Sequence, residues 1–376
     1  MRAVKNQAPD FDLEKKNTRS VYILFGISLI FFLLIRVIPE KSDARLMIKM
    51  KEASELMARA LTALGECRFK GERGSKPAAG DLPVRDAVLG QEMSPITTSL
   101  GSLPSKRTSV DPNLAGLMVF LLNKAGIKSH ETIAVGASGS FPALIVATLA
   151  AARTMEIHPV WICSLGASQW GANDPDFHWL RMWACLEEKK IFSVDPVAVS
   201  LGGEGDTGGG METEGRELLR KAAEKSGLPF IYEPDLKKNV ALRMQLYQEA
   251  SPGQEIRVFV NIGGGIANIG TDSEILNLRP GLVMPEHIPP PERRGVLFEM
   301  AGRGIRIIHL LYMKGLSSRF GIDWNPEALP RPGESGIYKL AGGRSGYFVL
   351  IVIFYLVLVL TVMTLMAVSR RRYWLE

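Results

Sequence analysis

Residues 132–168 decide the fold, and they read TIAVGASGSFPALIVATLAAARTMEIHPVWICSLGAS. The stretch predicts a short apolar strand over 132–135, a glycine turn, a helix over 141–154 and a second strand over 159–164. Gly136-Ala137-Ser138 recurs as Gly166-Ala167-Ser168, one strand–helix unit further along the chain. We therefore expect two turns of similar chemistry to lie side by side at one edge of a parallel sheet.

The same alternation continues downstream. Further strands are expected over 196–201, 229–232 and 257–262, and further helices over 175–190, 212–226 and 236–249. The pattern predicts an α/β fold, a doubly wound and mostly parallel sheet of the Rossmann-like kind with helices on both faces. After the proline-rich residues 285–291, a helix over 292–314 and an irregular tether over 320–346 are expected.

The region before this unit contains one helix pattern and one loop-like stretch. An apolar stripe predicts a helix over 42–66. Residues 71–110 are rich in Gly, Pro, Ser and Thr, which is typical of either a linker or an ordered binding loop. Asp111-Pro112 then opens a helix that Gly126 ends.

Two apolar stretches predict membrane helices, over 21–38, where Arg36 near the end can reach the membrane interface, and over the uncharged residues 347–369. Five basic residues precede the first stretch, and three arginines follow the second. Positive flanks stay in the cytoplasm, so both termini are expected there and the middle of the chain outside the cell membrane. Because no small-residue cleavage site follows residue 38, the first helix is expected to be an uncleaved signal anchor.

The expected organisation has seven parts. They are a cytoplasmic leader (1–20), a signal-anchor helix (21–38), a juxtamembrane helix and loop (39–110), an α/β ectodomain (111–284), a C-terminal helix and tether (285–346), a second membrane helix (347–369) and a cytoplasmic tail (370–376).

The net charge of +6 belongs to the membrane flanks. Of 45 basic and 39 acidic residues, nine basic and four acidic ones lie in residues 1–38 and 347–376. The remaining 36 basic and 35 acidic residues make a nearly neutral ectodomain, which argues against nucleic acid as a partner.

Three cysteines, Cys67, Cys163 and Cys185, leave two alternatives open. They form either one disulfide and one free thiol or three buried thiols. Their spacing does not suggest a zinc site.

Four glycine-containing loops follow the predicted strands, over 136–140, 165–174, 202–210 and 263–270. Loops at the carboxyl ends of parallel strands form the ligand crevice in such sheets, and their N–H groups favour anions. Tight turns also need glycine, so a purely structural role is the alternative. The candidate ligand-binding residues are Gly136, Gly139, Ser140, Ser168, Trp170, Asn173, Asp174, Asp206, Gly263, Gly264, Gly265 and Asn268.

Ser138 is the candidate nucleophile, because Gly136–Ser140 approaches the G-x-S-x-G turn of serine hydrolases and departs only at its last position. Its base would be His158, His178, His287 or His309, and spacing favours none of them. The alternative is that Ser138 and Ser140 hold an anionic ligand or cap the following helix.

No cofactor is predicted, and no dinucleotide or Walker A motif occurs. A divalent cation is the one alternative, held by the oxygen ligands Asp174, Asp176, Glu204 and Asp206, although no metal motif is present.

Four stretches together resemble the bacterial poly-gamma-glutamate system protein family. They are residues 97–103 (TTSLGSL), 137–143 (ASGSFPA), 164–177 (SLGASQWGANDPDF) and 261–265 (NIGGG), and the segment from Trp170 to Phe177 is the most specific of them. The resemblance implies a role in making, exporting or retaining poly-gamma-glutamate, as a capsule or a released polymer. It also implies the polymer, its amide ligase and its membrane subunit as partners. No catalytic residue carries over from the family.

Three functions are therefore open. The first is a membrane-anchored accessory subunit that binds the emerging polymer or the synthase subunits. The second is an extracytoplasmic hydrolase or transferase that uses Ser138. The third is an envelope sensor for an unrelated small anion.

Overall fold

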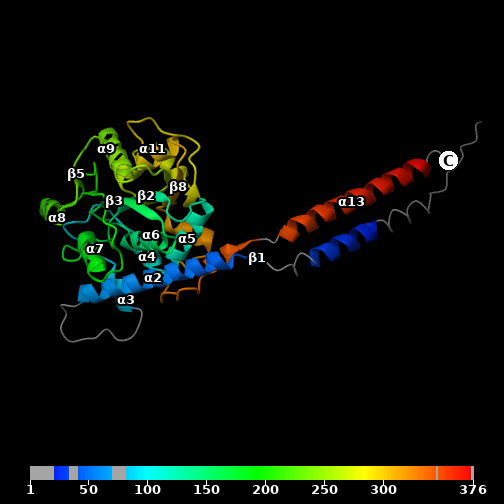
Figure 1. Cartoon of the computed structure of the whole chain (residues 1–376), viewed down its shortest axis with the longest axis horizontal. Coiled ribbons are helices and arrows are strands. Elements are labelled where there is room, and N and C mark those ends of the chain that lie inside the picture. Colours follow the sequence, from blue (N-terminus) through cyan, green and yellow to red (C-terminus); the bar gives the residue numbers. More distant parts are fainter. Residues whose placement is uncertain (1–20, 34–40, 70–81, 344–345, 374–376) are drawn as a thin grey trace, which may run out of the picture. The chain divides into compact units, whose positions relative to one another are not determined.

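The computed structural model describes residues 21–33, 41–69, 82–343 and 346–373 (Figure 1). The expected leader (1–20) and residues 34–38 of the expected first membrane helix lie outside these ranges. The chain divides into two compact units. One comprises Ala44–Ala341, and the other comprises Met1–Asp43 with Gly342–Glu376. The boundaries expected at residues 110 and 284 therefore both fall inside one unit.

The larger unit is built on a seven-stranded sheet, and this confirms the predicted α/β class. Its spatial order is β5-β4-β3-β2-β6-β8-β7, and every neighbouring pair is parallel except β7 with β8. The strands are β2 (Thr132–Ser138), β3 (His158–Ser164), β4 (Ala198–Ser200), β5 (Phe230–Ile231), β6 (Ile256–Ile262), β7 (Gly281–Val283) and β8 (Arg306–Leu310).

Alternate residues of the strands enter two separate cores, one on each face of the sheet. Ile133 and Val135 of β2 belong to the larger core, whereas Ala134 between them belongs to the smaller one. The larger core includes α2 (Ala44–Phe69), α5 (Asn113–Lys124), α6 (Pro142–Thr154), α7 (Trp179–Glu188), α8 (Thr213–Ser226) and α12 (Met313–Phe320). The smaller one includes α9 (Leu236–Glu249) and α11 (Val296–Gly302), so helices cover both faces as predicted.

The order of the strands creates a switch point between β2 and β6. From β2 the chain moves outward through β3, β4 and β5, and it then returns to the other side of β2 as β6. The loops after β2 and β6 therefore diverge at the carboxyl edge of the sheet, which opens a crevice there.

The helix predicted over 292–314 is wrong in its second half. It ends at Gly302, and β8 follows over Arg306–Leu310. Four of the five β8 residues are buried, and an apolar run of this length in an Arg- and Gly-containing stretch does not distinguish a buried strand from a helix.

The tether predicted over 320–346 is irregular over residues 321–335, as expected, but its last part is ordered on the larger unit. Within it, the 3-10 helix Gly336–Ala341 packs on the larger core, where Ile337 is fully buried. The Tyr338 hydroxyl oxygen lies 2.9 Å from Ser54 Oγ and 3.0 Å from Asn113 Oδ1, both within hydrogen-bond distance. These contacts join the segment to α2 and α5 and make it part of the compact unit.

A disulfide between Cys67 and Cys185 links α2 to α7, and Cys163 is a buried free thiol. Of the two alternatives that the sequence left open, the structure thus has one disulfide and one thiol. Trp161 of β3 and Trp183 of α7 pack edge to face, with ring centroids 5.1 Å apart.

In the smaller unit, α13 (Gly346–Tyr373) contains a 19-residue stretch, Leu350–Val368, with a mean hydropathy of 2.8. Among the described helices, only α13 is long and apolar enough to cross a membrane. The helix Val21–Leu33 is apolar but shorter, and it contacts α13, since Ser28 Oγ lies 2.9 Å from the Tyr355 hydroxyl. Strand β1 (Lys41–Ser42) pairs antiparallel with β9 (Gly342–Gly343).

Candidate functional site

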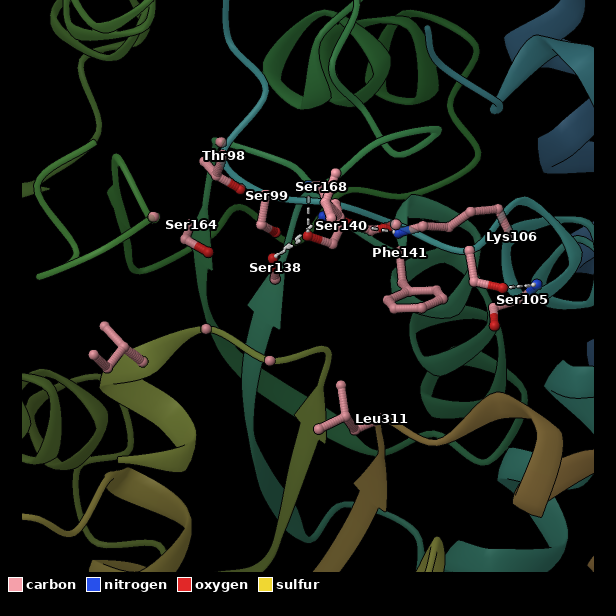
Figure 2. Close-up of a pocket in the computed structure, with 18 of the residues that line it drawn as sticks. Thr98, Ser99, Ser105, Lys106, Ser138, Ser140, Phe141, Ser164, Ser168 and Leu311 are labelled. Atoms are coloured by element: carbon pink, nitrogen blue, oxygen red, sulfur yellow. Dashed lines mark hydrogen bonds between the residues drawn. The ribbon is translucent and has the colours of Figure 1, made fainter. Parts of the chain in front are cut away.

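A cavity of about 510 Å³ lies at the carboxyl edge of the sheet. Its walls come from the loops that follow β2, β3, β4, β6 and β8, and from residues 98–106 (Figure 2). The cavity therefore occupies the switch point between β2 and β6, which is where open α/β sheets bind their ligands.

Hydroxyl groups dominate the polar lining of this cavity. The lining hydroxyls are those of Thr98, Ser99, Ser102, Ser105, Ser138, Ser140, Ser164 and Ser168. Among the lining residues only Lys106 and Glu204 are ionisable. Such a wall suits a polar ligand that accepts and donates several hydrogen bonds.

The Lys106 side chain is the chemically unusual group of the cavity. It is only 2% exposed, and no carboxylate pairs with it in the part of the chain that the structure describes. Its Nζ donates to Ser168 Oγ at 2.8 Å and to the carbonyl oxygen of Ser140, and it lies 3.8 Å from the centre of the Phe141 ring. Burial lowers the pKa of Lys106 to about 7, so near neutral pH both the ammonium and the amine are populated.

Residues 97–101 run alongside the loop after β3 and carry Lys106 into position. The Thr98 N–H donates to the carbonyl of Ala167 at 2.9 Å, and the Gln169 N–H donates to the carbonyl of Ser99 at 3.0 Å. The short helix α4 (Leu103–Ser109) follows, with Ser102 Oγ accepting from the N–H of Ser105. Over its described part, the 71–110 stretch is therefore the ordered loop rather than the linker.

Three serines form a connected chain beside Lys106. Ser138 Oγ accepts from the N–H of Ser140 at 3.2 Å and donates to Ser140 Oγ at 3.1 Å. Ser140 Oγ also accepts from the N–H of Ser168 at 3.0 Å. Ser140 Oγ therefore accepts two hydrogen bonds, one from each of the two repeated turns. The repeated Gly-Ala-Ser turns thus lie side by side as predicted, and Figure 2 shows their hydroxyls gathered on one wall.

Of the glycines predicted to bind a ligand, some line the cavity and others lie beneath its lining. Gly264 and Gly265 line the cavity. Gly136 and Gly139 lie under it, where an added Cβ would stand 2.6 Å from Asn268 Oδ1 and 2.7 Å from the Leu165 carbonyl oxygen, respectively.

The remaining two residues from the loop after β6 also lie beneath the lining. Gly263 has φ of +81° and backs onto Ser138, which explains why glycine is needed there. Asn268 is 2% exposed, and its Oδ1 has no hydrogen-bond partner among the described residues.

Trp170, Asn173 and Asp174 are not cavity residues. The Asn173 side chain donates to the Gln91 carbonyl at 2.8 Å and to Thr97 Oγ1 at 2.9 Å. Asp174 forms an ion pair with Arg68 of α2 at 2.9 Å. Trp170 adopts φ of +62°, and its N–H donates to the carbonyl of Gln91. The loop therefore holds the 91–97 segment and α2 in place, and it acts on the site indirectly.

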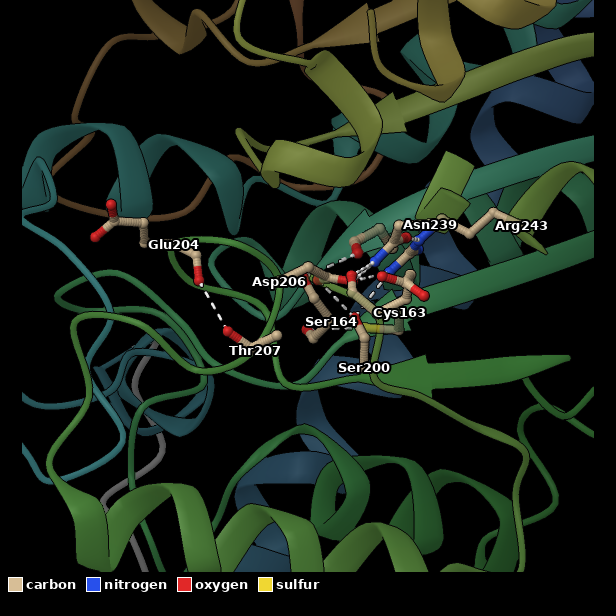
Figure 3. Close-up of polar contacts among 10 residues, drawn as sticks. Cys163, Ser164, Ser200, Glu204, Asp206, Thr207, Asn239 and Arg243 are labelled. Carbon is tan, nitrogen blue, oxygen red and sulfur yellow. Dashed lines mark hydrogen bonds and ion pairs between the residues drawn. The ribbon is translucent and has the colours of Figure 1, made fainter. Parts of the chain in front are cut away.

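Asp206 is also structural, contrary to the sequence expectation. It is 2% exposed and pairs with Arg243 at 2.7 Å, and it accepts from Ser200 Oγ at 2.8 Å and Asn239 Nδ2 at 3.0 Å (Figure 3). Its neighbour Glu204 is exposed and lines the cavity. The described residues contain no group of three or more His, Cys, Asp or Glu side chains that could hold a metal ion.

None of the five histidines lines the cavity, so none is placed as a base for Ser138. His309 Nδ1 lies 3.1 Å from Asn261 Nδ2 within the sheet, and burial lowers its pKa to about 4. His178 precedes α7, and burial lowers its pKa to about 4 as well. His158 begins β3, at the opposite edge of the sheet from Ser138, and His287 is exposed.

Sequence reasoning missed the most informative residue, Lys106, together with Ser105 and Leu311. Lys106 stands in a loop-like stretch, SLPSKRTS, where a lysine usually faces water. One pattern could have indicated the short helix that carries Lys106: Ser102-Leu103-Pro104 is typical of an N-cap followed by a proline in the first helical turn.

Comparison of the chain with protein-family models, curated proteins and solved structures gave no match.

Proposed function

We propose that this chain is a membrane-anchored component of the poly-gamma-glutamate machinery, and that its cavity binds carboxylate-bearing segments of the polymer outside the cell membrane. One observation carries the proposal: Lys106 offers a buried positive charge that no carboxylate of the described chain neutralises. A bound carboxylate would supply the missing negative charge, and the surrounding hydroxyls would hydrogen-bond to its oxygens.

The resemblance to the poly-gamma-glutamate system family supports the choice of polymer. All four stretches that carry it contribute to the cavity or to its support. Thr98, Ser138, Ser168 and Gly264 line the cavity, and Asn173 holds the segment that carries Thr98. The polymer carries one free carboxylate on every residue, so a local anion site suffices although the ectodomain is nearly neutral overall.

Two features support anchoring outside the cytoplasm. The helix Val21–Leu33 contacts α13 through Ser28 and Tyr355, as expected of a two-helix anchor. The Cys67–Cys185 disulfide suits an oxidising compartment. Both agree with a two-pass topology that leaves Ala44–Ala341 outside.

The proposal is tested by titrating the full-length protein in detergent micelles with γ-linked glutamate oligomers. Lys106→Met should weaken binding roughly 10- to 100-fold, which is the loss expected for one charge-assisted contact. Lys128→Met, which removes an exposed lysine elsewhere, should leave affinity unchanged. Affinity should also fall between pH 6 and 8 as Lys106 loses its proton.

Two outcomes would overturn the proposal. One is equal binding by the protein and by Lys106→Met, and the other is tight binding of a small metabolite anion with none of the oligomers, which favours an envelope sensor. In cells that keep the ligase and the membrane subunit, deleting this chain should abolish or mislocalise the polymer. Unchanged polymer in amount, length and location would contradict the pathway assignment.

A further inference from the structure

We propose that Ser168 and Lys106 form the nucleophile and the general base of an acyl-transfer site that cuts or transfers amide bonds next to carboxylates. The inference rests on the proposed function for its substrate class, but the catalytic pair is argued from geometry alone. Ser168 Oγ and Lys106 Nζ lie 2.8 Å apart in the wall of the cavity, within reach of direct proton transfer.

The environment of Lys106 Nζ suits a general base. Among the described residues, Lys106 Nζ donates to the Ser168 hydroxyl and to the Ser140 carbonyl, and it lies 3.8 Å from the centre of the Phe141 ring. The other ionisable group of the cavity, Glu204, belongs to the loop after β4 and forms no ion pair with Lys106. Because burial lowers the pKa of Lys106 to about 7, both forms are populated near neutral pH; the neutral amine can accept a proton from the Ser168 hydroxyl, whereas the ammonium is the form that would pair with a carboxylate.

Ser168 is the nucleophile rather than Ser138 or Ser140, because it alone of the three places its hydroxyl against Nζ. The N–H of Ser168 donates to Ser140 Oγ, which fixes the turn that presents the nucleophile. Ser140 therefore acts as a positioning residue for Ser168.

The reaction balances with these groups and one acceptor. Ser168 Oγ attacks the amide carbonyl and its proton passes to Lys106 Nζ, giving a tetrahedral intermediate. The C–N bond then breaks, Lys106 returns the proton to the departing amine, and a Ser168 ester remains. Water or an amine of the acceptor attacks the ester, loses a proton through Lys106 and releases Ser168. No oxidant, reductant or cofactor is needed.

The test uses a neutral alkyl fluorophosphonate on the full-length protein in detergent micelles. The probe should form an Oγ–P bond at Ser168 with loss of fluoride, detected as the mass of the labelled peptide. Labelling should increase with pH through about 7 and level off above it. Lys106→Met should slow labelling at least 100-fold, whereas Ser129→Ala, at an exposed serine elsewhere, should have no effect.

A second variant, Ser168→Cys, tests the pair independently, so that loss of labelling caused by misfolding is not mistaken for loss of the base. Ser168→Cys keeps a nucleophile in place, and iodoacetamide should alkylate it faster than the buried Cys163 thiol. That rate should fall when Lys106→Met is added. Absence of label from Ser168 between pH 6 and 9, or equal labelling with and without Lys106, would overturn the catalytic pair.

The outcomes separate this inference from the proposed function. Oligomer binding with no reaction at Ser168 would leave a binding protein and remove the acyl-transfer site. Reaction at Ser168 with no affinity for glutamate oligomers would keep the catalytic pair and reject the polymer as its substrate. Ser168→Ala should not shorten oligomers that the unchanged protein shortens.

Discussion

The burial of Lys106 predicts a specific dependence of stability on pH. The pKa falls from 10.5 to about 7 on folding, so between these values the unfolded chain holds the proton more tightly than the folded one. Stability must therefore rise with pH across this window, and the penalty is fully present below pH 7. At 1.36 kcal/mol for each pH unit, the whole effect is about 5 kcal/mol, of which about 2 kcal/mol is recovered between pH 7 and 9.

The assay compares urea unfolding of the full-length protein and of Lys106→Met at pH 7, 8 and 9. Fluorescence of the buried Trp161, Trp179 and Trp183 reports on the unfolding of the larger unit. Burial raises the pKa of the Cys163 thiol, which opposes the trend, but it does so in both proteins and cancels in the difference.

The difference in unfolding free energy between the two proteins should change by about 2 kcal/mol over these two pH units. Methionine is an unbranched side chain only one heavy atom shorter than lysine and cannot titrate, so the unfolding free energy of Lys106→Met should lack this rise with pH. Parallel curves for the two proteins would refute the reasoning, because Lys106 would then be charged in both states or neutral in both.

Three further substitutions test residues that support the fold around the cavity. Asp206→Asn should lower the free energy of unfolding by about 3–5 kcal/mol, because it leaves the buried Arg243 without its counter-charge; the urea midpoint measures it. Gly136→Ala should destabilise by about 1–3 kcal/mol, since the new methyl group would stand 2.6 Å from Asn268 Oδ1, and thermal melting measures it. Cys185→Ser should lower stability by up to about 5 kcal/mol by opening a loop of 118 residues, and unfolding with and without reductant measures it.

Matched controls distinguish these effects from general sensitivity. Glu204→Gln changes the exposed acidic neighbour of Asp206 and should leave the urea midpoint nearly unchanged. Gly302→Ala meets only an ordinary contact at 3.7 Å and should be neutral. The assigned roles would be contradicted if a control variant lost as much stability as the variant it is matched to, or if neither lost any.

The sheet was predictable because its strands alternate with helices and carry uninterrupted apolar runs. β2, β3 and β6 are found within a few residues of their predicted positions. The failures lie at the far edge of the sheet. β7 has only three residues and pairs antiparallel, and β8 follows a helix after a three-residue connection, so neither has a local pattern of its own.

The candidate site was half predictable for a similar reason. Ser138, Ser140 and Ser168 follow strands directly, so the sheet rule places them at the crevice. Lys106 depends instead on pairing between residues 97–101 and a loop more than sixty residues later, and no local pattern records such a contact. Asp206 was predicted to bind a ligand because the residues around it give no sign of its ion pair with the distant Arg243, which neutralises its charge.

The pairing of β1 with β9 brings the two ends of the larger unit close together, which is useful for protein engineering. Ser42 lies opposite Gly342, so the chain enters and leaves Ala44–Ala341 at neighbouring points. Such a unit can be cut out and its ends joined by a short linker, or reopened at another loop, with little strain on its core. The same geometry provides two covalent attachments, so a protease that cuts only one flanking segment leaves the site tethered through the other.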